Sequence, residues 1–242
     1  MTDPIYAVGD IHGQTQMLDR ALELIAADGG PDAHIVFMGD YTDRGPDSKG
    51  VIDRLIAGQS AGKPWTFLKG NHDRMFEWFM QDTPRHDPHM LVGYHWLHDR
   101  IGGIETLASY GVTFPERTRL EDVHQIAKQA VPQTHVDFLR GLSLSHEAGD
   151  LLFVHAGIRP GIPLDEQSEN DLVWIREPFL DDTTQHPRLI IHGHTALDHP
   201  QHFGNRIDLD GGAGYGRPLH PAVFEGTDCW LLKDDGRSPL TP

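Results

Sequence analysis

Five short apolar runs along this chain each lead into a compact polar signature. The runs occupy residues 5–8, 35–38, 65–68, 151–154 and 189–191. The signatures that follow them read GDIHG at 9–13, GDYTDRG at 39–45, GNHD at 70–73, HAG at 155–157 and HGHT at 192–195. Apolar runs of this length, bounded by glycine, are typical of buried β-strands. The sequence therefore predicts five strands that present polar side chains at their carboxyl ends.

Helical patterns alternate with the first of these strands. Apolar residues recur at helical spacing between Met17 and Ile25, and a second such pattern runs from Val51 to Ile56. This alternation predicts a sheet rich in parallel strands with right-handed crossovers. Further strand-like runs lie at 206–209, 222–225 and 229–232. We therefore expect an α/β fold in which two sheets pack face to face, with helices outside.

The chain is expected to form a single domain over residues 1–242, a length that one large domain can reach. Residues 74–150 differ in character, because their segments are rich in Trp, His and charge and follow helical spacing. We interpret them as a helical insertion beside the site, with 94–98 as one of its helices. The polar tail at 234–242 is predicted to be disordered.

The formal net charge is −16 at pH 7. This acidic excess argues against binding to duplex nucleic acid or to an anionic membrane surface. No stretch approaches a membrane span, and the first strand begins at Ile5, so we expect a cytoplasmic protein. A phosphorylated substrate stays compatible with the charge, because bound cations can reverse the field locally.

The polar signatures supply a ligand set for two divalent cations. Asp10 and His12 are two residues apart after a strand, so both side chains point to one side of an extended backbone. Asp10, His12 and Asp40 are assigned to one cation, and Asp40 bridges to a second that is held by Asn71, His155 and His194. A single member of this set could be an ordinary turn or core residue, but together they favour a two-metal site. We expect Mn, with Fe, Zn or Co as alternatives.

Three further residues carry chemistry next to these ligands. His72 follows Asn71 and is the candidate general acid for the leaving oxygen. Asp43 could orient its imidazole, as carboxylates do at many histidine sites. Arg44 suits two oxygens of a phosphate, although a salt bridge to a nearby carboxylate is the alternative.

The motifs GDxHG, GDxxDRG and GNHD, in this order, resemble those of the PPP-type metallophosphoesterases, the serine/threonine protein phosphatases of the calcineurin-like fold. The resemblance implies a four-layer αββα sandwich and the same two-metal assignment. It also implies that Arg176 joins Arg44 in binding the substrate phosphate, which Asn71 is expected to contact as well.

Single positions at which this chain differs from the family motifs indicate which branch of the family it resembles. Asp73 stands where the eukaryotic enzymes have Glu, and Lys69 where they have Arg, which resembles the compact bacterial and phage type. Symmetrical dinucleoside tetraphosphatases share the core motifs, but they usually lack the acid that is Asp43 here. Cyclic-nucleotide phosphodiesterases place a second histidine two residues after the position of His194, where this chain has Ala196.

We therefore expect a metal-dependent phosphomonoesterase, a serine/threonine protein phosphatase in which a hydroxide held between two cations attacks phosphorus directly. Its partner would be a phosphoprotein or a small phosphorylated substrate. The first alternative is a symmetrical dinucleoside polyphosphate hydrolase. The second is a non-catalytic phosphate-binding protein, which the intact set of ligands and His72 argue against.

Overall fold

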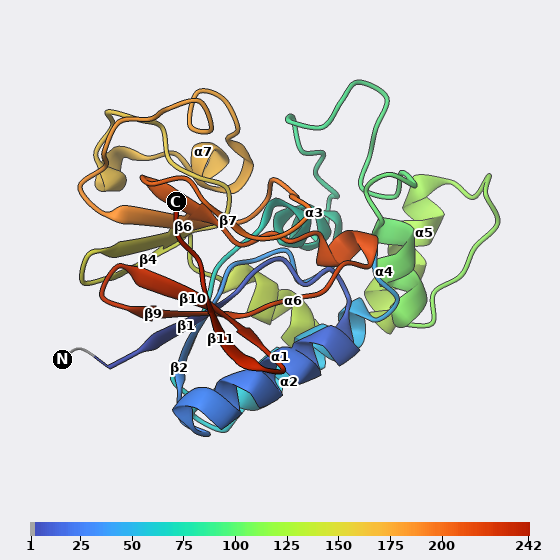
Figure 1. Cartoon of the computed structure of the whole chain (residues 1–242). Helices are drawn as coiled ribbons and strands as arrows, with labels where there is room; N and C mark the ends of the chain where they lie inside the picture. Colours follow the sequence, from blue (N-terminus) through green and yellow to red (C-terminus); the bar gives the residue numbers. More distant parts are fainter. Residues whose placement is uncertain (1–2) are drawn as a thin grey trace.

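The computed structural model describes residues 3–242 and contains two β-sheets (Figure 1). The six strands of the first sheet lie in the order β11 (Gly236–Pro239), β10 (Asp228–Lys233), β9 (Ala222–Glu225), β1 (Ile5–Val8), β2 (His34–Phe37) and β3 (Trp65–Phe67). The five strands of the second lie in the order β4 (Ser145–Ala148), β5 (Leu151–Val154), β6 (Leu189–His192), β8 (Arg206–Asp208) and β7 (Gln201–His202). The predicted parallel pairs are present, since β2 lies parallel to β1 and to β3, and β6 lies parallel to β5 and to β8.

The helices follow the predicted alternation at the start of the chain. They are α1 (Thr15–Gly29), α2 (Ser48–Ser60), α3 (Asn71–Phe79), α4 (Gly103–Ser109), α5 (Leu120–Ala130), α6 (Gln133–Arg140) and α7 (Glu169–Trp174), with short 3₁₀ turns at Leu164–Glu166 and Ala213–Tyr215. No helix of residues 3–242 has both the length and the apolar character that crossing a bilayer requires.

Strand alternation divides the buried residues into three clusters. Along β1, Tyr6 faces the cluster formed with α1 and α2, whereas Ala7 faces the cluster between the two sheets. On the far side of the second sheet, Leu152 packs with Leu172 of α7 and with Phe179. The result is the predicted four-layer order, in which the last layer consists of α7 and its flanking loops (Figure 1).

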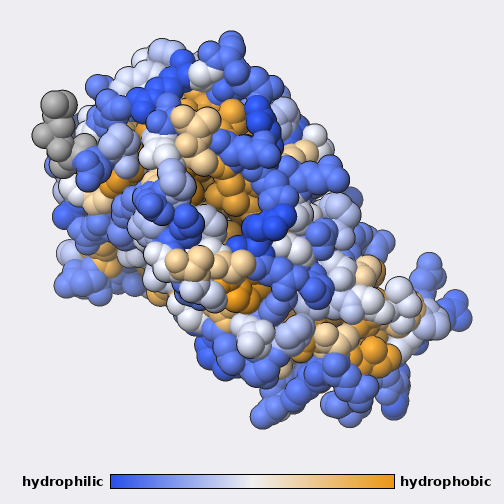
Figure 2. All heavy atoms as spheres, turned by 90° about the horizontal axis from the view of Figure 1, so that it is seen from below, coloured by the Kyte–Doolittle hydropathy of each residue, from blue (hydrophilic) through white to orange (hydrophobic). Residues whose placement is uncertain are grey.

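The face that Figure 2 shows lies below the first sheet in the orientation of Figure 1. Hydrophobic atoms gather in the middle of this face and hydrophilic side chains surround them. Helix α1 follows the same division, because Leu18, Ala21 and Ile25 are buried while Arg20 and Glu23 are exposed. The exposed pairs add little stability, so burial of the apolar stripe holds the helix in place.

Two predictions of local structure are wrong, one for the tail at 234–242 and one for residues 94–98. The tail is not disordered throughout, because 236–239 form β11, which pairs with β10 and is held by Arg237 contacts to Asp28 and Glu225. Gly236, at φ 109°, allows the tight reversal between the two strands. Residues 94–98 form turns rather than a helix, and the insertion ends in strand β4.

Candidate active site

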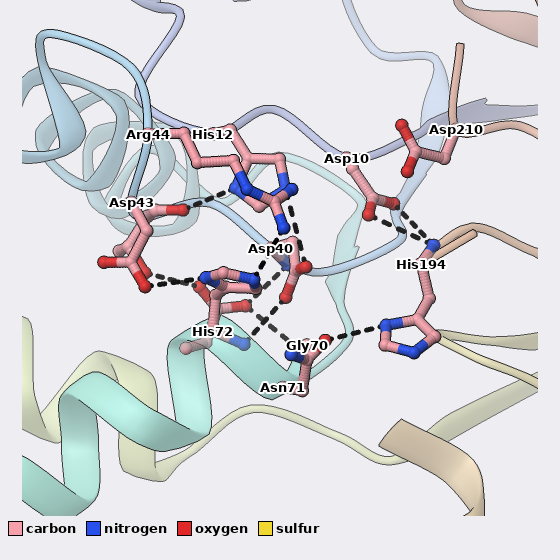
Figure 3. A network of polar contacts seen from close by, with 12 residues as sticks. Asp10, His12, Asp40, Asp43, Arg44, Gly70, Asn71, His72, His194 and Asp210 are labelled. Carbon is pink, nitrogen blue, oxygen red and sulfur yellow. Dashed lines mark hydrogen bonds and ion pairs between the residues drawn. The ribbon is translucent and has the colours of Figure 1, made fainter. Parts of the chain in front are cut away.

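The predicted ligands come together where the strands of the two sheets end. Asp10, Asp40 and Asn71 follow β1, β2 and β3, whereas His155 and His194 follow β5 and β6. Figure 3 shows the side chains of Asp10, Asp40, Asn71 and His194 converging from separate elements. All are buried, with exposed fractions of 8% or less. The strand ends therefore build one buried polar centre, as the sequence pattern predicts.

The backbone at this centre is held in an unusual conformation. Among residues 3–242, every non-glycine residue with positive φ belongs to the predicted site: His12, Asp40, Asp43, Arg44 and His194, with φ between 47° and 72°. The left-handed region is costly for residues with a Cβ atom and persists only where the surrounding structure enforces it. Backbone strain is thus found at residues of the predicted active site.

Two groups of donors share Asp40. One consists of His12, Asp40 and His72, the other of Asp40, His155 and His194, and in each the ligand atoms lie within 4.8 Å of one another. Asp10 belongs to neither group. Its carboxylate accepts hydrogen bonds from the backbone N–H of His194 at 3.1 and 3.3 Å. The shared position of Asp40 is the one expected of a bridging ligand.

The second group and the neighbouring Asn71 fit a cation, because hydrogen-bond acceptors face one another there. His155 donates Nδ1–H to the Met38 carbonyl at 2.9 Å, so its Nε2 carries a lone pair. That lone pair lies 3.1 Å from the carbonyl oxygen of Asn71, and burial lowers the pKa of His155 to about 4, which leaves no proton between the two. His194 Nδ1 lies 2.8 Å from the same Asn71 oxygen, and burial, followed by the charge of His155, lowers the pKa of His194 well below its usual range. These donors suit a borderline divalent cation.

The first group has the same tautomer. His12 donates Nδ1–H to the Thr42 carbonyl at 2.7 Å and turns Nε2 inward, 3.6 Å from Asp40 Oδ2. Burial, followed by the positive charge of Arg44, lowers the pKa of His12 well below its usual range. A neutral imidazole whose Nε2 carries a lone pair is the form that binds metal, and in this structure Arg44 Nη1 lies 2.6 Å from that nitrogen.

The carboxylates of the centre repel one another when no cation is bound. Burial raises the pKa of Asp40 to about 7. Asp10 is raised well above its usual pKa by burial first, and then by the negative charges of Asp210, Asp40 and Asp208. Asp210 was not predicted from the sequence, because it lies in an irregular segment after β8. Such a cluster favours binding of positive charge.

The Asp73 carboxylate holds the loop that carries the bridging ligand, Asp40. This carboxylate accepts the backbone N–H groups of Asp40 at 2.8 Å, Tyr41 at 2.9 Å and Gly70 at 3.0 Å. These bonds tie the loop after β2 to the start of α3. The last residue of the GNHD signature is therefore a scaffold for the two loops that carry Asp40 and Asn71.

His72 and Asp43 form the predicted dyad, since His72 Nδ1 lies 2.7 Å from Asp43 Oδ2. Burial raises the pKa of Asp43 well above its usual range, although hydrogen bonds from Thr106 and Trp96 oppose that rise. Sequence reasoning missed Thr106 and Trp96, because both are remote in the chain from Asp43.

The two predicted phosphate-binding arginines lie near each other. Arg44 points its guanidinium at His12 Nε2, 2.6 Å away, and at His72 Nε2, 3.1 Å away (Figure 3). Partial burial, followed by the charge of Arg44, lowers the pKa of Arg176. Neither arginine forms a salt bridge with a carboxylate of residues 3–242. Their charge is thus available to an anion, which disfavours the salt-bridge alternative for Arg44.

A side chain at position 193, where the chain has glycine, is expected to weaken metal binding. A Cβ atom there would lie 2.1 Å from Asp10 Oδ1 and would displace that carboxylate. We predict that Gly193→Ala lowers Mn²⁺ affinity by about 10- to 100-fold, measured by calorimetry on metal-free protein. Gly141→Ala is the matched control, because its Cβ atom would meet nothing closer than 3.4 Å. Equal Mn²⁺ affinity in both variants would contradict the assignment of Asp10 as a ligand.

Comparison with known proteins gives the family. The sequence model of the calcineurin-like phosphoesterases matches residues 3–211. The chain belongs to this family. Its members are phosphoesterase hydrolases, and the family implies divalent metals at the centre described above.

The relatives of this calcineurin-like phosphoesterase carry more than one name. A symmetrical bis(5'-nucleosyl)-tetraphosphatase from Acidovorax sp. (strain JS42) is 31% identical over 64% of this chain, but the match spans only 44% of that relative. Five further curated relatives are also tetraphosphatases. Serine/threonine-protein phosphatase 2 of Escherichia coli (strain K12) is 40% identical over 29% of this chain and 30% of its own length.

A solved structure agrees over the whole fold. A cold-active protein tyrosine phosphatase superposes with a TM-score of 0.65 at 18% identity, covering 100% of this chain and 81% of that one. At this identity the likeness supports the fold alone.

Proposed function

We propose that this phosphoesterase is a metal-dependent phosphomonoesterase that removes phosphate from serine or threonine side chains of phosphoproteins. The observation that carries the proposal is the buried pair of Asp43 and His72, with Nδ1 and Oδ2 2.7 Å apart. A serine or threonine alkoxide is a poor leaving group and needs a proton as the P–O bond breaks. Nucleotide phosphates leave readily without one. The dyad therefore favours an alkyl phosphate ester as substrate.

The residues that would hold two cations are Asp10, His12, Asp40, Asn71, His155 and His194. The donor set suits Mn²⁺, with Fe, Zn and Co as alternatives. When bound, such a pair supplies an activated water for attack on phosphorus and neutralises charge on the phosphate.

The remaining steps belong to side chains of this chain. Arg44 and Arg176 bind and orient the phosphate oxygens, with Asn71 as a further contact. His72 delivers a proton from Nε2 to the leaving oxygen, and Asp43 stabilises the imidazolium that carries this proton. Burial first, and then the charge of Arg44, keeps the pKa of His72 well below its usual range in the ligand-free protein. A phosphate dianion beside Arg44 offsets that charge and so favours the protonated form of His72.

A second candidate function is hydrolysis of dinucleoside polyphosphates. It is favoured by the names of the relatives, most of which are tetraphosphatases. The same phosphate-binding arginines and metal ligands would serve it. It differs in needing no general acid, because the leaving group is already a stable anion. Protein phosphatase activity should therefore depend on His72 as a proton donor, whereas dinucleoside polyphosphate hydrolysis should not.

A paired turnover assay tests the proposal. Metal-stripped protein is titrated with Mn²⁺ while turnover is compared on a phosphothreonine peptide and on diadenosine tetraphosphate. We expect metal-dependent turnover with preference for the peptide. Preference for the dinucleotide would transfer the assignment to the second candidate. Binding of the phosphopeptide without turnover under any divalent metal would support a non-catalytic protein.

A further inference from the structure

The helical insertion reaches the catalytic dyad through two buried side chains. Trp96 lies in the turns before α4, and Thr106 lies within α4. Both donate hydrogen bonds to the Asp43 carboxylate. We propose that Thr106 and Trp96 are positioning residues for the general acid, acting on His72 through Asp43. This inference rests on the proposed role of His72 and assigns the insertion a part in the reaction.

Thr106 holds Asp43 at two points. Its hydroxyl donates to Asp43 Oδ1 at 2.7 Å and accepts the backbone N–H of Asp43 at 2.8 Å. Ser48 Oγ lies 3.0 Å from the same hydroxyl. Asp43 has φ 72°, so a bond to its N–H and one to its carboxylate together fix a strained backbone and its side chain.

Trp96 binds the other side of the carboxylate. Its indole N–H lies 2.9 Å from Oδ2 and 3.1 Å from Oδ1 of Asp43. The ring is packed against Phe76, with centroids 4.9 Å apart, and against Phe79 at 4.7 Å. Gly103 permits this packing, since a Cβ atom there would come within 2.7 Å of the indole ring. The donor is therefore held in place by α3 and by the start of α4.

These contacts leave Asp43 one orientation. With Thr106 and Trp96 in place, the carboxylate has its third donor in His72 Nδ1, and Nε2 of that ring then points at Arg44, where a phosphate would bind. The supports fix the direction in which the proton is delivered. Their loss should slow only those reactions in which the leaving group needs a proton.

The test compares kcat for a phosphothreonine peptide with kcat for p-nitrophenyl phosphate, whose leaving group needs little protonation, in Mn²⁺-loaded full-length protein. Thr106→Val removes the hydroxyl and keeps the shape. We expect its kcat to fall by about 10- to 100-fold on the peptide and to change by less than about 2-fold on the aryl ester. Thr106→Ser restores the hydroxyl and should recover the peptide rate. Trp96→Phe is a second, independent variant that removes the indole N–H and keeps an aromatic ring, although a smaller one, against Phe76 and Phe79, and it should show the same selectivity.

Ser109→Ala is the control, because Ser109 lies one turn along α4 and bonds to the Thr106 carbonyl rather than to Asp43. His72→Asn distinguishes a failure of the general-acid role of His72 from a failure of the positioning role of Thr106 and Trp96. If His72→Asn is selective for the peptide but Thr106→Val and Trp96→Phe are not, the positioning role is wrong and the proposed function stands. If His72→Asn slows neither substrate, or slows both equally, the general acid itself is wrong. Equal loss on both substrates in the Thr106 and Trp96 variants, without rescue by Thr106→Ser, would mark them as structural only.

Discussion

Asp40→Asn is expected to abolish turnover and, at the same time, to raise the melting temperature of the metal-free protein. Asp40 is shared by both groups of donors, so its loss should remove roughly a thousandfold or more of activity. Its carboxyl is 2% exposed, and burial raises its pKa to about 7. Asparagine fits the left-handed backbone at φ 52° and retains an oxygen for the bond from the His72 N–H.

The stability effect has a definite pH window. A carboxyl whose folded pKa is raised makes the folded state bind its proton more tightly than the unfolded chain does. Metal-free wild-type protein therefore loses stability as the pH rises from about 4, the unfolded value, to about 7. Asp40→Asn lacks this loss, so its melting temperature should exceed that of wild type by roughly 5 °C at pH 8 and by less at pH 5.

Scanning calorimetry with chelator present gives this comparison directly. Asp53→Asn is a suitable control, because Asp53 is a half-exposed carboxylate on α2 away from the centre. A melting temperature for Asp40→Asn below that of wild type at pH 8 would contradict the electrostatic account. So would retention of wild-type turnover with saturating Mn²⁺.

His72→Asn should separate metal binding from proton transfer. The imidazole of His72 is not needed in the proposed ligand set, so the variant should bind Mn²⁺ with wild-type stoichiometry. It should lose about 10²- to 10⁴-fold in kcat on a phosphoserine peptide, the range that a general acid supplies. The loss on p-nitrophenyl phosphate should be much smaller, because that leaving group is stable as an anion.

The leaving-group dependence is measured with a series of aryl and alkyl phosphates. For His72→Asn, log kcat should fall more steeply with the pKa of the leaving alcohol than it does for wild type. A wild-type rate on the phosphoserine peptide would exclude His72 as the acid. Loss of one bound Mn²⁺ would instead place His72 among the ligands, as its position in the first group of donors allows.

The strand ends were predictable because a local pattern fixes them. The runs at 5–8 and 151–154 became β1 and β5 with the predicted bounds, and each signature after a run lies at the buried centre. Local pattern could not reveal β7 or β4. The two-residue strand β7 has too few positions for a period to be read, and β4 is polar and only half-buried.

The supports of the dyad were beyond the reach of sequence pattern. Trp96 and Thr106 are separated from Asp43 by 53 and 63 residues, so only the folded insertion brings them together. Sequence reasoning placed the insertion beside the site and associated it with substrate specificity, but it identified none of the insertion's residues that contact the dyad. The ligands and the acid follow strands, whereas the groups that hold the acid come from an insertion whose contacts depend on tertiary packing.

The central claim is that the strand ends hold two cations around Asp40. The most direct measurement is a crystal structure of protein grown with Mn²⁺, with anomalous differences recorded at the manganese absorption edge. We expect two anomalous peaks a few ångströms apart, one against Asp10, His12 and Asp40 and the other against Asp40, Asn71, His155 and His194. A single peak, or peaks that do not contact Asp40, would contradict the two-metal account.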